Sequence, residues 1–313
     1  MSEKAYRVLL YYKYVDIAEP EQFVQDHKAL CKKLNLKGRI LIGSEGINGT
    51  LAGRTEDTDE YKRIMGEDER FADIHWKEDA YDSIPFPKLK VKYREEIVTL
   101  GLPGEAPSSR GGEHLSPEEW HKMAADENAV ILDARNDYEW EIGKFKDAIL
   151  PDVKTFREFP QWVKDHKEEL EGKKVLMYCT GGIRCERAST VLKDEGLDDV
   201  YQLSGGIVTY GKEIPDGLWE GSCFVFDERM AVQVNDDEHH DVISTCHHCE
   251  TATDVYYNCC NAQCNKLILL CEECKELSNM ACSEDCSTKH RAGVVKRWNI
   301  KTRTAEVPVQ EIA

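Results

Sequence analysis

The chain has 313 residues, of which 41% are hydrophobic and 32% charged, and its formal net charge is −18. This length suits two or three domains of average size better than a single core. No apolar run is long enough to cross a bilayer, so we expect no membrane contact. The negative charge gives no general attraction for a nucleic-acid backbone, and any RNA contact must therefore be local.

Residues 1–101 alternate strand-like and helix-like segments, and the glycines and Asn48 of Gly43–Thr50 suit a tight turn. The expected strands are Arg7–Tyr14, Gly38–Ile42, Leu51–Gly53 and Ile74–Lys77, and the expected helices are Pro20–Leu34 and Thr58–Met65. This β-α-β-β-α-β order predicts a ferredoxin-like domain of the acylphosphatase type, an α+β fold.

Residues 102–117 are rich in Pro, Gly and Ser and predict a linker that ends at a helix start, Ser116-Pro-Glu-Glu119. Residues 118–222 form the next predicted domain, with strands at Val130–Asp133, Lys174–Tyr178 and Val200–Leu203 and helices at Phe159–Leu170 and Glu186–Asp194. Short apolar strands that alternate with helices indicate a parallel α/β sheet covered on both faces. Its active loop should lie at the carboxyl end of a strand.

The stretch Cys179-Thr-Gly-Gly-Ile-Arg-Cys185 lies between a predicted strand and a predicted helix. Gly181 and Gly182 allow several backbone N–H groups to converge, and the helix adds the positive end of its dipole. With Arg184 close by, Cys179 should have a lowered pKa and act as a nucleophilic thiolate. The same groups would stabilise the terminal sulfur of a persulfide.

The four residues between Cys179 and Arg184 make a shorter loop than the one that wraps phosphate in cysteine phosphatases, which favours sulfur chemistry. Two roles stay open for Cys185. It could form a disulfide with Cys179 during turnover, or be an inert residue at the helix start.

Three landmarks in chain order resemble the rhodanese family: Val130-Ile-Leu-Asp-Ala-Arg-Asn-Asp-Tyr-Glu-Trp-Glu-Ile-Gly143, the cysteine loop, and Val200-Tyr-Gln-Leu-Ser-Gly-Gly-Ile207. The chain departs from that pattern at Lys144 and Cys185. Over nearly its whole length, including Gly43-Ser-Glu-Gly-Ile-Asn-Gly-Thr50, it resembles the rhodanese-domain tRNA uridine hydroxylases.

The resemblance implies an oxidoreductase that converts the wobble uridine of tRNA to 5-hydroxyuridine with molecular oxygen and depends on Cys179. The implied partner is a tRNA anticodon loop. The N-terminus enters a strand-like pattern without the apolar segment of a signal peptide, so we expect a cytoplasmic protein. We recognise no flavin or nicotinamide fingerprint and no signal for an oligomeric state. The candidate catalytic residues are Cys179, Arg184 and Cys185, and the candidate substrate-binding residues are Gly181, Gly182, Asp133 and Arg135.

Residues 223–313 form a third predicted unit, a cysteine-rich module with nine of the thirteen cysteines between Cys246 and Cys286. In a reducing compartment such clusters are better explained as metal sites than as disulfides. Cys246-x-x-Cys249 and Cys271-x-x-Cys274 predict one structural zinc site. A second site is expected from Cys260, Cys264, Cys282 and Cys286, with Cys259 spare or exchanging with Cys260.

Two other functions are compatible with these motifs. The cysteine loop alone suggests a sulfurtransferase that works through a cysteine persulfide. A non-enzymatic alternative is a zinc-stapled binding protein on a rhodanese scaffold.

Overall fold

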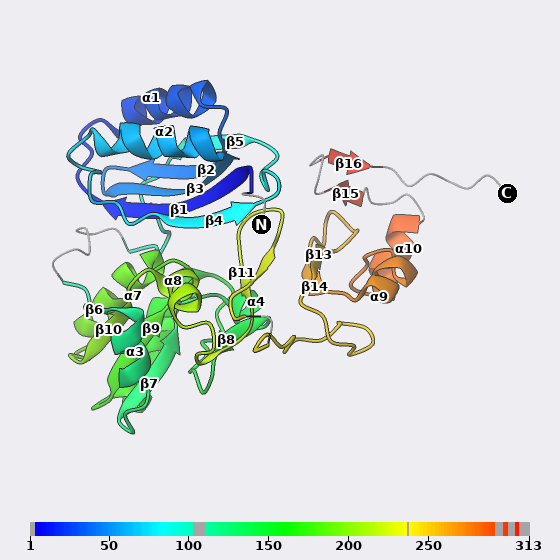
Figure 1. Ribbon diagram of the computed structural model, residues 1–313. Coiled ribbons are helices and arrows are strands. Elements are labelled where there is room, and N and C mark those ends of the chain that lie inside the picture. Colours follow the sequence, from blue (N-terminus) through cyan, green and yellow to red (C-terminus); the bar gives the residue numbers. More distant parts are fainter. Residues whose placement is uncertain (1–3, 103–109, 237, 292–296, 300–303, 307–313) are drawn as a thin grey trace.

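The computed structural model describes residues 4–102, 110–236, 238–291, 297–299 and 304–306. The described chain folds into an N-terminal domain, a central domain and a cysteine-rich C-terminal part (Figure 1). Within these residues no helix has both the length and the apolar character needed to span a bilayer.

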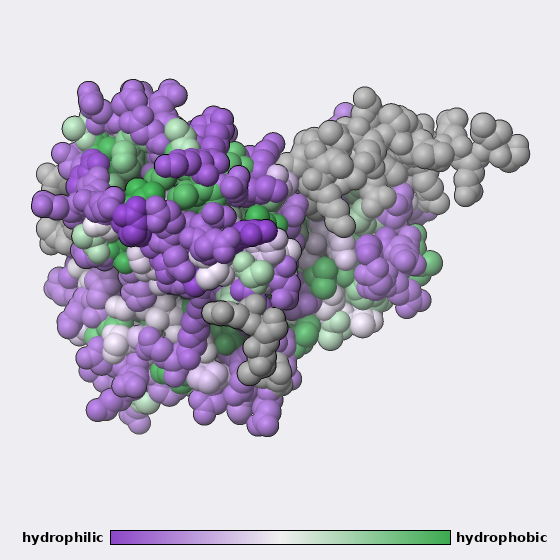
Figure 2. Space-filling view, turned by 45° about the horizontal axis from the view of Figure 1, so that its top comes forward, coloured by the Kyte–Doolittle hydropathy of each residue, from purple (hydrophilic) through white to green (hydrophobic). Residues whose placement is uncertain are grey.

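The N-terminal domain is a five-stranded sheet in the order β4-β1-β3-β2-β5 with two helices on one face (Figure 1). The elements are β1 (Tyr6–Tyr14), α1 (Pro20–Lys33), β2 (Lys37–Gly43), β3 (Gly46–Arg54), α2 (Thr55–Gly66), β4 (Lys77–Tyr81) and β5 (Leu89–Tyr93). The first four strands pair antiparallel, as the ferredoxin-like prediction requires, and β5 adds to the edge parallel to β2. Figure 2 shows mainly hydrophilic side chains on the visible outer face.

Alternation along the strands gives this sheet two different faces. On β1, Leu9 and Tyr11 are fully buried in the core under the helices. Their neighbours Leu10 and Tyr12 point to the opposite face because successive side chains of a strand alternate. That second face lies toward the central domain (Figure 1).

The central domain holds a parallel sheet in the order β6-β10-β9-β7. Its strands are β6 (Glu113–Leu115), β7 (Ala129–Asp133), β9 (Lys174–Tyr178) and β10 (Val200–Leu203). Its helical segments are α3 (Pro117–Met123), α4 (Asp137–Trp140), η2 (Phe156–Glu158), α5 (Phe159–Asp165), α6 (Lys167–Leu170), α7 (Ile183–Asp194) and α8 (Gly206–Glu213). Val175 and Met177 of β9 pack in one core, and Leu176 and Tyr178 pack in the other, so helices cover both faces as predicted.

A second, three-stranded sheet in the order β12-β11-β8 joins the central domain to the C-terminal part. It consists of β8 (Gly143–Phe145), β11 (Trp219–Phe224) and β12 (Ala231–Gln233). The C-terminal part contains β13 (Tyr256–Asn258), β14 (Leu267–Leu269), α9 (Glu272–Leu277), α10 (Glu284–Arg291), β15 (Arg297–Asn299) and β16 (Thr304–Glu306). Tyr256 fixes it to the central domain by donating a hydrogen bond of 2.7 Å to Glu141.

Several predicted boundaries are wrong. β6 lies within the expected linker 102–117 because it pairs with β10, so the linker is shorter. The boundary between residues 222 and 223 cuts through β11, which pairs with β8 and β12. The fourth strand begins at Lys77 instead of Ile74, and the turn before β3 is confined to Ser44 and Glu45. The capping box predicted at Ser116 is confirmed.

Candidate functional site

Cys179 follows β9 directly, at the carboxyl end of the parallel sheet, and only 1% of it is exposed. The backbone N–H of Gly182 donates to its Sγ at 3.1 Å. Gly182 has φ +99°, a conformation that an L side chain rarely adopts. Gly206 approaches so closely that a Cβ there would lie 2.5 Å from the Cys179 carbonyl oxygen. The two glycines therefore let the loop curl around the sulfur.

The surroundings of Cys179 favour its thiolate. Burial alone would raise the pKa, but a hydrogen bond from Cys185, the charge of Arg184 and backbone N–H groups lower it to about 5. Burial and the bond to Cys179 raise the pKa of Cys185 well above its ordinary value. Cys185 is therefore the protonated donor and Cys179 the charged acceptor at neutral pH.

Arg184 is held by a residue that the sequence analysis did not identify. Both oxygens of the fully buried Glu139, at α4, accept hydrogen bonds from its guanidinium, one of them at 2.7 Å. The same guanidinium donates to Thr180 Oγ1 at 3.4 Å. This bidentate pair fixes the cation beside the loop.

Asp133 and Arg135, predicted as supports for the loop or the substrate, lie inside the central domain and do not line the cavity over Cys179. Both are fully buried, and their side chains pair with each other at 2.7 Å. Arg135 also donates to the Gly143 carbonyl at 2.7 Å and lies over the rings of Tyr178 and Trp219. Of the two roles, this position suits support of the strand end beneath the loop, because both side chains point into the domain.

A cavity of about 480 Å³ opens over Cys179 between the two domains. The cysteine loop contributes Cys179, Thr180, Gly181, Ile183 and Arg184 to its lining. The second face of the N-terminal sheet contributes Leu10, Tyr12, Arg39, Leu41, Asn48 and Thr50. Of the predicted loop residues, Gly181 thus faces the cavity, whereas Gly182 acts through its N–H.

Tyr12 separates this cavity from a second, polar one of about 320 Å³. Its hydroxyl donates to Glu186 at 2.8 Å, and Glu186 lies 3.4 Å from His114. Lys77 lies 4.8 Å from the centre of the Tyr12 ring, and burial lowers its pKa to about 8. No sequence motif indicated these residues, because the N-terminal sheet supplies two of the four.

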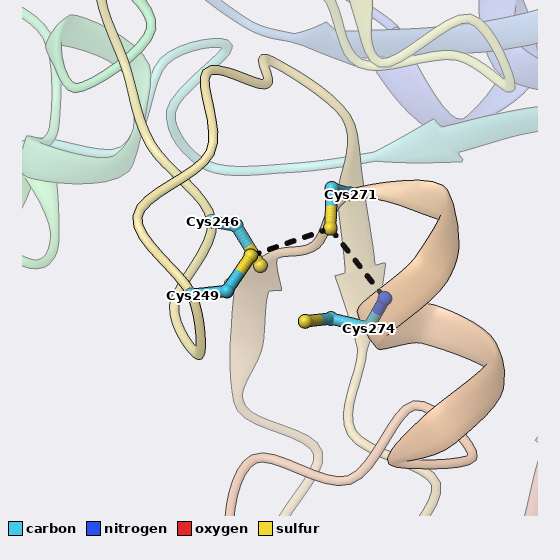
Figure 3. Close-up of side chains that lie close together, drawn as sticks. All are labelled: Cys246, Cys249, Cys271 and Cys274. Atoms are coloured by element: carbon cyan, nitrogen blue, oxygen red, sulfur yellow. Dashed lines mark hydrogen bonds between the residues drawn. The ribbon is translucent and has the colours of Figure 1, made fainter.

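The nine C-terminal cysteines gather into two groups of four, with one cysteine outside them. Figure 3 shows the first group, Cys246, Cys249, Cys271 and Cys274, which is the set predicted from the spacing. All its sulfur atoms lie within 4.8 Å of one another, and the Sγ atoms of Cys249 and Cys271 are 3.6 Å apart. Four thiolates around a tetrahedral zinc ion lie about 3.8 Å apart, so this group fits the ion.

The second group is Cys259, Cys264, Cys282 and Cys286, which corrects the prediction of Cys260. The Cys259 N–H continues the β13–β14 ladder to Lys266, and its Sγ accepts a hydrogen bond from Cys282 N at 3.5 Å. The Cys260 N–H bonds instead to Met280. Spacing could not decide between two adjacent cysteines whose side chains leave the backbone in different directions.

Three family models match the chain in order. They are the UPF0176 acylphosphatase like domain over residues 6–97, the Rhodanese-like domain over 116–213 and the Rhodanase C-terminal model over 220–287. The predicted acylphosphatase-like and rhodanese-like domains are thereby confirmed.

Two relatives illustrate the similarity over the whole chain. A protein named tRNA uridine(34) hydroxylase from Bacillus pumilus is 48% identical over 99% of this chain and 95% of its own. Its namesake from Bacillus mycoides is 49% identical over 99% and 98%. The chain belongs to the tRNA uridine(34) hydroxylase family. The family resemblance inferred from the cysteine loop and the flanking motifs is therefore confirmed.

Proposed function

We propose that this protein hydroxylates the wobble uridine of tRNA to 5-hydroxyuridine, with molecular oxygen as co-substrate, and acts in the cytoplasm. The observation that carries the proposal is the Cys179 thiolate at the base of a cavity that both domains enclose. A uridine in an anticodon loop is already unpaired, so little energy is needed to turn it into such a cavity.

In this proposal each loop residue has a defined task. Cys179 faces the bound nucleotide as a nucleophile, Cys185 and the Gly182 N–H hold its negative charge, and Arg184 supplies the counter-charge. Glu139 positions Arg184. We assign the two cysteine groups of the C-terminal part to structural zinc, since four-sulfur sites are closed and hold no open position for a reactant.

The experiment compares tRNA nucleosides by mass spectrometry in a deletion strain complemented with wild type, Cys179→Ser or Cys185→Ser. We expect wild type to restore 5-hydroxyuridine derivatives and Cys179→Ser to restore none. Unchanged levels of these nucleosides in the deletion strain would rule the proposal out.

Sulfur transfer is the second candidate, because the N–H group and charge that hold the thiolate would also hold a persulfide. Incubation with thiosulfate followed by mass spectrometry tests it, and a protein that never gains sulfur on Cys179 argues against it. Full activity of Cys179→Ser would instead favour the zinc-stapled binding protein.

A further inference from the structure

The tip of the β11–β12 hairpin places an exposed aromatic ring at the cavity over Cys179. Phe226 lines this cavity together with Cys179 and Arg184. It is 55% exposed, more than any other Phe, Tyr or Trp side chain within residues 4–102, 110–236 and 238–289. A single exposed apolar ring is common on protein surfaces; what distinguishes Phe226 is its place in the lining of the cavity over the thiolate.

This ring stands on an anchored loop. The Val225 N–H donates to the Met230 carbonyl at 2.9 Å and closes the hairpin tip. The Glu228 N–H donates to the Pro85 carbonyl of the N-terminal domain at 3.0 Å. Arg229 pairs with Asp227 beside it and with Asp79 on β4. The hairpin tip is therefore fixed to both domains.

The ring itself is also oriented. Its centre lies 5.3 Å from that of Phe224 at an angle of 77°, an edge-to-face contact that fixes the tilt of the ring. The Arg184 guanidinium lies 5.9 Å from the ring centre. A ligand that covers Phe226 thus meets an ordered surface, and little conformational entropy is lost on binding.

The remaining lining defines what that ligand is. The cavity of about 480 Å³ is large enough for a single nucleotide. Arg39 of β2 and Arg157 of η2 line it too, and both are exposed. The flat aromatic ring suits a planar base beside the thiolate. The two exposed guanidinium groups suit phosphates on either side of that base, because guanidinium groups pair well with phosphate.

We propose that Phe226 is the stacking platform that holds the target base over Cys179, with Arg39 and Arg157 binding the adjoining phosphates. This inference rests on the proposed function, which supplies a tRNA uridine as the substrate. Phe226 is a positioning residue that selects an unstacked base, and Cys179 is the reacting group.

The test measures binding of the full-length protein to an unmodified anticodon stem-loop with uridine at the wobble position, by fluorescence anisotropy of end-labelled RNA. Base–aromatic stacking is strong enough that Phe226→Ala should raise the Kd about tenfold. Phe226→Trp keeps a stacking ring and should bind like wild type, and its added indole emission should be quenched by the RNA. The control is Leu277→Ala, which removes another exposed apolar side chain, 79% exposed at the end of α9.

A second RNA with an abasic wobble nucleotide identifies the base in contact. Wild type and Phe226→Ala should bind this RNA equally, since the stacking partner is gone. If Phe226→Ala weakens binding of both RNAs alike, or of neither, the inference is overturned. An unchanged pH profile of Cys179 alkylation in Phe226→Ala would show that the thiolate loop has kept its structure.

The two proposals fail in different ways. In one outcome, wild-type protein binds the uridine RNA more tightly than Phe226→Ala does, yet produces no 5-hydroxyuridine with oxygen in a cell extract. That result overturns the hydroxylation and supports the stacking role. In another outcome, wild type and Phe226→Ala both convert the uridine, with the same kcat/KM. That result supports the hydroxylation and overturns the stacking role. Wild-type protein that binds neither RNA overturns both.

Discussion

Replacing Cys185 by alanine tests how the thiolate is stabilised. Cys185 is fully buried and donates a hydrogen bond to Cys179, whose pKa is about 5. A hydrogen bond to a charged group contributes about 1.5–3 kcal/mol. One pKa unit corresponds to about 1.4 kcal/mol, so Cys185→Ala should raise the Cys179 pKa by about one to two units. Cys185→Ser keeps a donor and should leave the pKa near 5.

The assay follows the rate of Cys179 alkylation by iodoacetamide against pH, with the modified peptide quantified by mass spectrometry. The matched control is Cys31→Ala, which removes a fully buried thiol from the N-terminal core without contact to Cys179. If Cys185→Ala titrates like wild type, the hydrogen-bond argument is wrong. If Cys185→Ser keeps the pKa but abolishes turnover, Cys185 instead forms the disulfide that the sequence left open.

Three further outcomes are expected. Glu139→Gln removes the charge that pairs with buried Arg184 and should lower the free energy of unfolding in urea by about 3–5 kcal/mol. The control Glu168→Gln, on the exposed side of α6, should change this free energy little. Equal effects of the two substitutions would refute the role of the buried ion pair. Folding lowers the Cys179 pKa from near 9 to about 5, so the thiolate's stabilising contribution is complete above pH 9 and is lost as the pH falls through 5. The stability gap between wild type and Cys179→Ala should therefore narrow over that range, and a constant gap would contradict it. Chelation should release two zinc ions per chain, counted by plasma mass spectrometry. Loss of the metal should expose residues 246–286 to protease while the two other domains stay intact. An unchanged digestion pattern after metal loss would argue against a structural role of the zinc.

The sequence was informative where the chemistry is local. Six consecutive residues contain Cys179, Gly181, Gly182 and Arg184. The strand, loop and helix signals of the sequence therefore identify them without tertiary information. Glu139 and Phe226 are forty or more residues away from the loop and reach it only through the fold. For Asp133 and Arg135 the sequence left open support of the loop or of the substrate, since a position at a strand end predicts proximity to the site but not the direction of the side chain.

The direction of a side chain also explains why Cys259, and not Cys260, belongs to the second cysteine group. Ligand spacing in a C-x-x-C knuckle constrains both cysteines together, and that group is correct. Adjacent Cys259 and Cys260 carry no such constraint, because one step along an extended chain reverses the side chain. Only the hydrogen bonds of the hairpin to Lys266 and Met280 determine which sulfur faces the cluster.

The arrangement of α7 explains why the thiolate loop and the N-terminal domain act as one site. Three consecutive residues of its first turns are buried, and each has a different partner. Cys185 bonds to the thiolate, Glu186 accepts from Tyr12 of β1, and Arg187 lies 2.9 Å from Glu96. The backbone hydrogen bonds of the helix hold these three neighbouring residues in fixed positions relative to one another. Tyr12 and Glu96 therefore contact the same helix that supplies the hydrogen-bond donor to the Cys179 thiolate, so the N-terminal domain supports the loop from behind.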